Sequence, residues 1–148
     1  MTAPADPAGP PRSRAIATWL ALVGGGLGLH RFYLHGSRDV WAWLHPWPTL
    51  VGAYGFWRMR EFGVDDARGS LLVPILGVML AATMLQAIVY GLASDERWAA
   101  RFGIESDHRR GWPVVLAVVL ALAVGAGATM ATIAFAAQRY FESRADVR

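Results

Sequence analysis

The sequence predicts an all-α integral membrane protein with four hydrophobic helical segments, arranged as two helical hairpins. Of its 148 residues, 55% are hydrophobic and only 17% are charged, whereas soluble domains carry about a quarter of their residues as charged side chains. Residues 71–93 hold no ionisable side chain except Tyr90, and residues 112–138 hold no charge. Both runs exceed the roughly 18–20 apolar residues that mark a membrane span. This pattern excludes a soluble enzyme, a coiled coil and a disordered chain.

The N-terminal end combines a polar tail with the first hydrophobic segment. Residues 1–14 are rich in Pro and Ala and are predicted to be disordered, because they offer neither helix nor core. An apolar run from Ala15 to Leu29 follows Arg12 and Arg14. Such an order is typical of a signal peptide, but no small-x-small cleavage site follows it. An uncleaved first helix is therefore the favoured interpretation.

The second segment, residues 40–57, is broken by proline. The run His45-Pro46-Trp47-Pro48 places two prolines near its start, and each proline removes a backbone donor and disfavours helical geometry in the residue before it. In lipid, such backbone must be covered by protein or lie at the interface. Residues 39–47 are therefore predicted to be interfacial or re-entrant, with a short helix over residues 48–57. A kinked full span is the alternative.

The rest of the chain is predicted to form a second transmembrane hairpin with polar flanks. The predicted organisation is a disordered tail (1–14), a first hairpin (15–57), a polar loop (58–70), the second hairpin (71–138) and a polar tail (139–148). The polar connections that begin near Trp57 and Trp98 share an aromatic residue, Phe-Gly, an acid and a final Arg and Gly. Either a duplicated hairpin or the ordinary needs of helix ends explains this likeness.

Small residues recur in the last segment at a spacing suited to helix packing. Ala121, Gly125 and Thr129 are four residues apart, and small side chains at this spacing let helices approach closely in lipid. They predict packing rather than a ligand. The spans contain only Gln86 and a few threonines as polar groups, which most often bond across helices or back to their own carbonyls.

The most specific motif follows the first segment and reads Gly24-Gly25-Gly26-Leu27-Gly28-Leu29-His30-Arg31-Phe32-Tyr33-Leu34-His35-Gly36. It is not a dinucleotide-binding loop, because the third glycine of that pattern is missing and nothing upstream resembles a strand. Gly24 and Gly28 have the spacing of close helix packing. Arg31 can donate to helix carbonyls, bind lipid phosphate, or stack on Phe32 or Tyr33.

This stretch resembles the TM2 domain family, whose hallmark is a Gly-rich first helix running into a Gly-x-His-Arg-Phe-Tyr-x-Gly-like turn and a second helix. The matching residues are Gly28, His30, Arg31, Phe32, Tyr33 and, one residue late, Gly36. The resemblance covers about residues 15–57. It implies a bacterial inner-membrane protein of a family whose role is largely uncharacterised, and it implies no reaction.

No catalytic, cofactor-binding or metal-binding residue is predicted. The chain has no cysteine, which excludes disulfides and thiolate metal sites. His30, His35 and His45 would meet Asp39 if the second segment folded back, but their spacing matches no standard ligand pattern. The acidic pairs of the loops fit salt bridges and helix caps better than acid–base chemistry, which needs a dry pocket. The chain is therefore expected not to be an enzyme.

The net charge of +3 comes from arginines, which favour span ends and cytoplasmic loops, and so it does not indicate nucleic acid. With four crossings, the side of the two termini carries more arginines, which weakly favours cytoplasmic termini. We expect a multi-pass structural or interaction module of the bacterial inner membrane, with the bilayer as partner and other membrane proteins or self-association left open. The alternative is a component of a small oligomeric transporter or channel, and a purely lipid-sensing role that uses the Arg-rich loops is a third possibility. The expected interaction residues are Gly24, Gly28, His30, Arg31, Phe32, Tyr33 and Gly36, and the expected packing residues are Ala121, Gly125 and Thr129.

Overall fold

The computed structural model describes residues 12–102 and 111–145, and every element in these ranges is a helix. The elements are α1 (Arg14–Gly24), the 3-10 turn η1 (Gly25–Leu27), α2 (Leu29–His35), α3 (Val40–Leu44), α4 (Pro46–Phe62), α5 (Ala67–Leu92), α6 (Asp95–Phe102) and α7 (Trp112–Ala145). The prediction of an all-α fold is confirmed for the described part of the chain.

Four hydrophobic helical segments are predicted, but not all of them are long enough to cross a membrane. Among the described residues, only α5 and α7 are long and apolar enough to cross a membrane. The first segment ends as a helix at Gly24 and turns through η1, so its apolar helical run covers only residues 14–27. The second segment forms α3 and the 17-residue α4, whose last turns carry charges. Glycine and proline thus divide the N-terminal half into pieces shorter than a bilayer.

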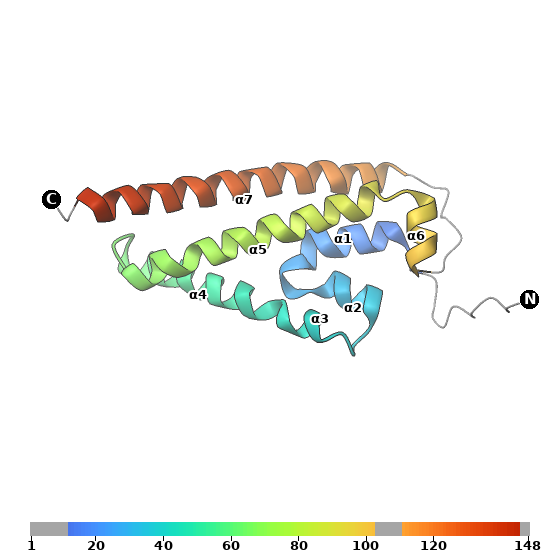
Figure 1. The fold of residues 1–148 in the computed structure, drawn as a ribbon, viewed down its shortest axis with the longest axis horizontal. Helices are drawn as coiled ribbons and strands as arrows, with labels where there is room; N and C mark the ends of the chain where they lie inside the picture. Colours follow the sequence, from blue (N-terminus) through green and yellow to red (C-terminus); the bar gives the residue numbers. More distant parts are fainter. Residues whose placement is uncertain (1–11, 103–110, 146–148) are drawn as a thin grey trace, which may run out of the picture.

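Helix α5 lies at the centre of the bundle, with α7 along one side and α1 and α4 along another (Figure 1). The close contacts of glycine residues show in which order α4, η1 and α1 lie along α5. Gly55 and Gly52 of α4 face Leu72 and Leu76, and Gly25 of η1 faces Thr83. Farther along, Gly91 faces the side chain of Thr18 in α1. Helices α1 and α4 therefore lie end to end along α5, and we call this pair the split helix.

The two ends of the described chain lie at opposite ends of the bundle (Figure 1). Arg14 binds the carbonyl oxygen of Ala93, just after the C-terminal end of α5, at 2.6 Å. Arg139, near the other end of the chain, donates to Ser70 Oγ in the first turn of α5 at 2.8 Å. The expectation that both termini share one side depended on four crossings. The split helix, α5 and α7 make three layers instead.

Several boundaries also differ from the sequence prediction. Residues 40–44 form a helix, although the predicted helix of this segment starts only at residue 48. Helix α4 begins at Pro46 because both prolines occupy its first turn, where no backbone donor is needed. The predicted polar loop 58–70 shrinks to residues 63–66 between two helices. Helix α7 continues to Ala145 through the predicted polar tail. Residues 1–11, 103–110 and 146–148, and the predictions made for them, lie outside the described residues.

The core is small and is built mainly from small side chains. One cluster joins Ala21 of α1, Met84 and Ala87 of α5 and Ala121 of α7. A second cluster joins Ala17, Leu34 and Trp98 at the end of the bundle that holds α6. Of the apolar stretches of α5 and α7, less than a quarter is buried. Most of the apolar surface of these two helices therefore faces outward.

Candidate functional site

The glycine run turns the chain back at the break in the split helix. Helix α1 ends at Gly24, and Gly28 has a φ of 74° in the left-handed region, where glycine is favoured. A Cβ atom on Gly28 would lie 2.8 Å from the carbonyl oxygen of Ala42 and 2.9 Å from His45 Cβ. A Cβ atom on Gly24 would collide with Leu29. Both glycines therefore serve the turn between α1 and α2, and it is Gly25 that packs against α5.

The side chains of the motif after the glycines contact their own chain. Arg31 Nε donates to Asp39 Oδ2 at 2.9 Å, and the same oxygen lies 2.8 Å from a terminal guanidinium nitrogen. The ring of Phe32 meets Trp43 edge to face, with centroids 5.2 Å apart. The hydroxyl of Tyr33 accepts the backbone N–H of Ser13 at 2.8 Å. These contacts fasten α2 to the start of α1 and to α3.

Asp39 is held in its ionised form within this turn. Its carboxylate accepts the backbone N–H of Trp41 at 3.1 Å and so caps the N-terminus of α3. Burial opposes ionisation, but the hydrogen bonds from Arg31 and Trp41 outweigh it and hold the pKa of Asp39 below its ordinary value. Gly36, with a φ of 78°, ends α2, and its Cβ position is open. The conformation of the loop 36–39 thus depends on the glycine at its start and the carboxylate at its end.

A polar cluster lies beside the break and consists of the buried His30 and the half-buried His45, Gln86 and Tyr90. His30 is fully buried, with its ring 5.6 Å from that of His45 and 5.8 Å from that of Tyr90, measured between centroids. Neither ring nitrogen of His30 makes a hydrogen bond to a described residue, and nor do His45 Nε2 and Gln86 Oε1. Buried polar atoms are nearly always satisfied in native proteins. The four unsatisfied atoms therefore make this cluster a candidate functional site.

The two imidazole rings give the cluster hydrogen-bonding groups of both kinds. A neutral imidazole has one donor and one acceptor, and ring nitrogens of both histidines are among the unsatisfied atoms.

The histidines do not converge on Asp39. His35 Nδ1 lies 3.9 Å from Asp39 Oδ2, while His30 pairs with His45 instead. In the described ranges, no three side chains among His, Cys, Asp and Glu are placed to hold a metal ion.

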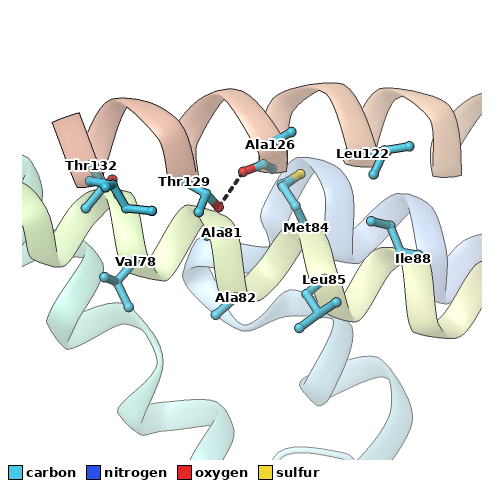
Figure 2. Close-up of a pocket in the computed structure, with 13 residues that line it drawn as sticks. Val78, Ala81, Ala82, Met84, Leu85, Ile88, Leu122, Ala126, Thr129 and Thr132 are labelled. Carbon is cyan, nitrogen blue, oxygen red and sulfur yellow. Dashed lines mark hydrogen bonds between the residues drawn. The ribbon is translucent and has the colours of Figure 1, made fainter.

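The small residues of α7 line its contact with α5, where an open apolar groove of about 480 Å³ lies (Figure 2). Ala121 is fully buried, and a Cβ atom on Gly125 would lie 2.8 Å from Met84 Cβ. Thr129 is exposed and donates to the carbonyl oxygen of Gly125 at 2.8 Å. Two of the three residues therefore lie against α5, and the third satisfies a carbonyl of its own helix.

Sequence reasoning did not assign Gln86 and Tyr90 to the site. They are four residues apart on α5 and so share one face of the helix. That spacing, in an apolar run with no other strongly polar side chain, was the available signal. The sequence could not predict which residues contact Gln86 and Tyr90, because His30 and His45 lie beside them only after the chain reverses at Gly28.

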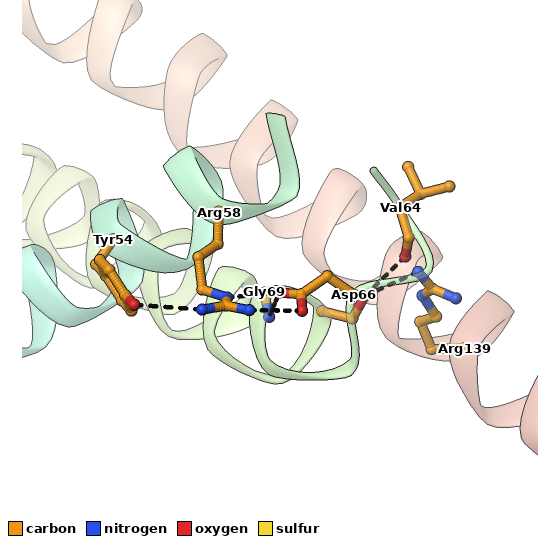
Figure 3. Close-up of polar contacts among 7 residues, drawn as sticks. Tyr54, Arg58, Val64, Asp66, Gly69 and Arg139 are labelled. Carbon is orange, nitrogen blue, oxygen red and sulfur yellow. Dashed lines mark hydrogen bonds and ion pairs between the residues drawn. The ribbon is translucent and has the colours of Figure 1, made fainter. Parts of the chain in front are cut away.

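The loop acids are expected to form salt bridges and helix caps, and Asp66 does both where α4 meets α5 (Figure 3), although the sequence did not identify its partner. Arg58 binds both oxygens of Asp66, at 2.8 and 2.9 Å, and Asp66 also accepts the backbone N–H of Gly69 at 2.7 Å. These hydrogen bonds lower the pKa of Asp66 to about 2. Asp66 therefore both caps α5 and binds the end of the split helix.

Comparisons with protein-family models, with curated proteins and with solved structures give no match to this chain. Its function must be inferred from its own chemistry.

Proposed function

We propose that the chain is a multi-pass protein of the bacterial inner membrane that acts as a structural and interaction module. The observation that carries the proposal is the apolar exterior of the bundle. Large apolar side chains project outward along both long helices, among them Leu71, Val78, Leu85, Val119, Met130 and Ile133. A soluble protein rarely exposes a continuous apolar surface of this extent. Lipid removes this surface from water without further protein.

The TM2-like motif supports a structural role within this proposal. Arg31, Phe32 and Tyr33 are already bound to Asp39, Trp43 and Ser13. Their contacts hold the α1–α2–α3 turn against the bundle, so the motif shapes the split helix. The surface left for lipid, another membrane protein or a second copy is the outward face of α5 and α7. The expected interaction role of the motif is therefore indirect.

The three-layer arrangement gives the proposal a sharp test, because the chain has no cysteine of its own. Single cysteines at Arg12, Asp65, Glu96 and Ser143 are labelled in inverted and right-side-out vesicles with a membrane-impermeant maleimide. We expect Arg12→Cys and Glu96→Cys to react from one side, and Asp65→Cys and Ser143→Cys from the other. Labelling of Arg12→Cys and Asp65→Cys from the same side would exclude the split helix as one crossing.

The same vesicles test membrane embedding itself. An embedded chain stays in the pellet after alkaline extraction and is released by detergent, because its apolar exterior is covered by lipid. Release by alkali alone would contradict the proposal. The result of the extraction does not depend on the side from which the cysteines are labelled. The two experiments therefore distinguish a failure of membrane embedding from a failure of the three-layer topology.

A component of a small transporter or channel is the second candidate function. The observation that favours it is the break in the split helix beside His30, His45 and Gln86, because transporters place substrate sites at discontinuous helices. Flux through proteoliposomes should then be lost in His30→Leu and retained in His35→Leu, since His35 is exposed. Equal flux in both variants, or none in the unaltered protein, would remove this candidate.

A further inference from the structure

We infer that the pocket between the end of α5 and helix α6 binds the phosphate head group of an anionic phospholipid. The inference rests on the proposed embedding of α5 in a membrane. The pocket has a volume of about 420 Å³. Helix α5 contributes apolar side chains to it, including Val89 and Leu92, and α6 contributes Arg97 and Arg101. One cavity therefore joins a hydrocarbon-like wall to two guanidinium groups.

Among the described residues, both charged side chains that line the pocket are arginines. Helix α6 also carries Asp95 and Glu96, but neither lines the pocket. Asp95 is bound by Arg14 with a nitrogen–oxygen distance of 2.8 Å. The side chain of Arg14 is only 7% exposed. Guanidinium groups bind phosphate through planar, paired hydrogen bonds. The lining thus matches a phosphate rather than a cationic or neutral group.

Aromatic side chains form the third part of the lining and fix α6 in place. Trp98 is buried, meets the ring of Tyr90 edge to face at 6.1 Å and lies 4.6 Å from the ring of Phe102. Its indole Nε1 donates to the carbonyl oxygen of Arg12 at 3.1 Å. Trp and Tyr prefer the depth of lipid head groups, where one end of the ring is apolar and the other is wet. In the proposed membrane, these rings would place the pocket at that depth.

The position of the pocket distinguishes a lipid from free phosphate. Helix α5 ends at Leu92, and the arginines follow within three turns of it, so they lie where the proposed span leaves the hydrocarbon. Free phosphate would use the arginines but leave the wall formed by Val89 and Leu92 exposed to water. The glycerol and first methylene groups of a phospholipid would cover that wall. The bilayer lipid is therefore the occupant that uses the whole lining.

The test uses the full chain in nanodiscs of phosphatidylcholine containing increasing fractions of phosphatidylglycerol with brominated acyl chains. Quenching of tryptophan fluorescence reports binding, and Trp98→Phe identifies the part that comes from the pocket. Each arginine near a lipid surface contributes about fivefold to binding, so Arg97→Gln with Arg101→Gln should weaken it by roughly thirtyfold. The matched control is Arg60→Gln with Arg68→Gln, which removes the same charge from exposed positions at the other end of α5.

Loss of binding in the pocket variant but not in the control supports the inference. Equal losses in both variants would show general attraction to surface charge and would overturn it. Quenching by brominated phosphatidylcholine as strong as that by phosphatidylglycerol would overturn the preference for an anionic head group. Loss of the phosphatidylglycerol-dependent quenching when inorganic phosphate is added to the same discs would overturn the assignment to lipid. A chain that does not enter the discs contradicts the membrane proposal itself, which is a different outcome from the other three.

Discussion

Replacing Gly52 by alanine tests the close contact between α4 and α5 on which the split helix depends. A Cβ atom on Gly52 would collide with the backbone nitrogen of Leu76 and lie 2.7 Å from its Cα. Backbone cannot rotate away as a side chain can, so α4 must move off α5. Overpacking costs about 1–3 kcal/mol, whereas alanine favours a helix over glycine by about 0.5–1 kcal/mol. The net expected loss of unfolding free energy is about 1–2 kcal/mol, roughly a tenfold change in the unfolding equilibrium.

Gly127→Ala is the matched control, because Gly127 also lies within a helix but nothing lies within 4 Å of its Cβ position. This variant should gain about 0.5–1 kcal/mol from helix propensity alone. Reversible unfolding in mixed micelles, followed by far-UV circular dichroism, measures both. Opposite shifts are expected. A gain of stability in Gly52→Ala equal to that in Gly127→Ala would refute the close approach of α4 to α5.

Three further predictions concern the turn, the cluster and the α4–α5 ion pair. Gly28→Ala should destabilise the chain by about 1–2 kcal/mol from its left-handed backbone, and further because its Cβ would lie 2.8 Å from the carbonyl oxygen of Ala42, measured by the same unfolding experiment. His30→Leu should leave stability unchanged or raise it by about 1 kcal/mol, since it removes two unsatisfied buried atoms; a large loss would show that these atoms are satisfied. Because the pKa of Asp66 is lowered from 3.8 to about 2, its stabilising effect is complete above 3.8 and is lost as the pH falls toward 2. Asp66→Asn should flatten this acid dependence of the melting temperature.

The C-terminal half of the fold could be predicted from sequence because its signal is local. An uninterrupted apolar run of more than 20 residues has few options other than a long helix, and α5 and α7 follow the two runs closely. The ends were harder to predict. Helix α7 extends into the predicted tail, where Gln138 and Arg139 pair with Glu142 one turn away. Such pairs extend a helix without adding apolar residues, so the hydropathy of the sequence does not reveal them.

The N-terminal half could not be predicted because contacts distant in sequence decide where its chain turns. Residues 15–29 contain enough apolar side chains to suggest one helix. The structure instead turns the chain where Gly25 meets Thr83 and where Thr49 donates to the carbonyl oxygen of Gly26 at 2.7 Å. Hydropathy measures how apolar a segment is, not which neighbour its backbone approaches. The glycine run was identified, but its role as a reversal rather than a packing face was not.

The polar contacts of the site show the same limit. For Arg31, the sequence suggested helix carbonyls, lipid phosphate or aromatic rings, and the structure pairs it with Asp39, eight residues later. The pairing depends on the tight loop at Gly36, whose φ of 78° brings α3 back toward α2. A carboxylate at this distance is reachable only after the loop is known. The residue types could therefore be predicted as important, while their partners could not.

The distribution of polar contacts also separates the ends of the bundle from its middle. One end is held by Arg14, which is buried and binds Asp95, and the other by Arg58 with Asp66. Between them, the break in the split helix is held by the hydrogen bond from Thr49 to Gly26, by apolar packing and by the histidines, whose remaining polar atoms lack partners. Unsatisfied buried groups lower the cost of opening wherever water can reach them, because water restores their hydrogen bonds. Opening at the break therefore costs less than it would if these atoms were satisfied. A structural module and a transporter component differ in whether that opening is used, which is why His30→Leu, rather than any change at the ends, separates the two proposed functions.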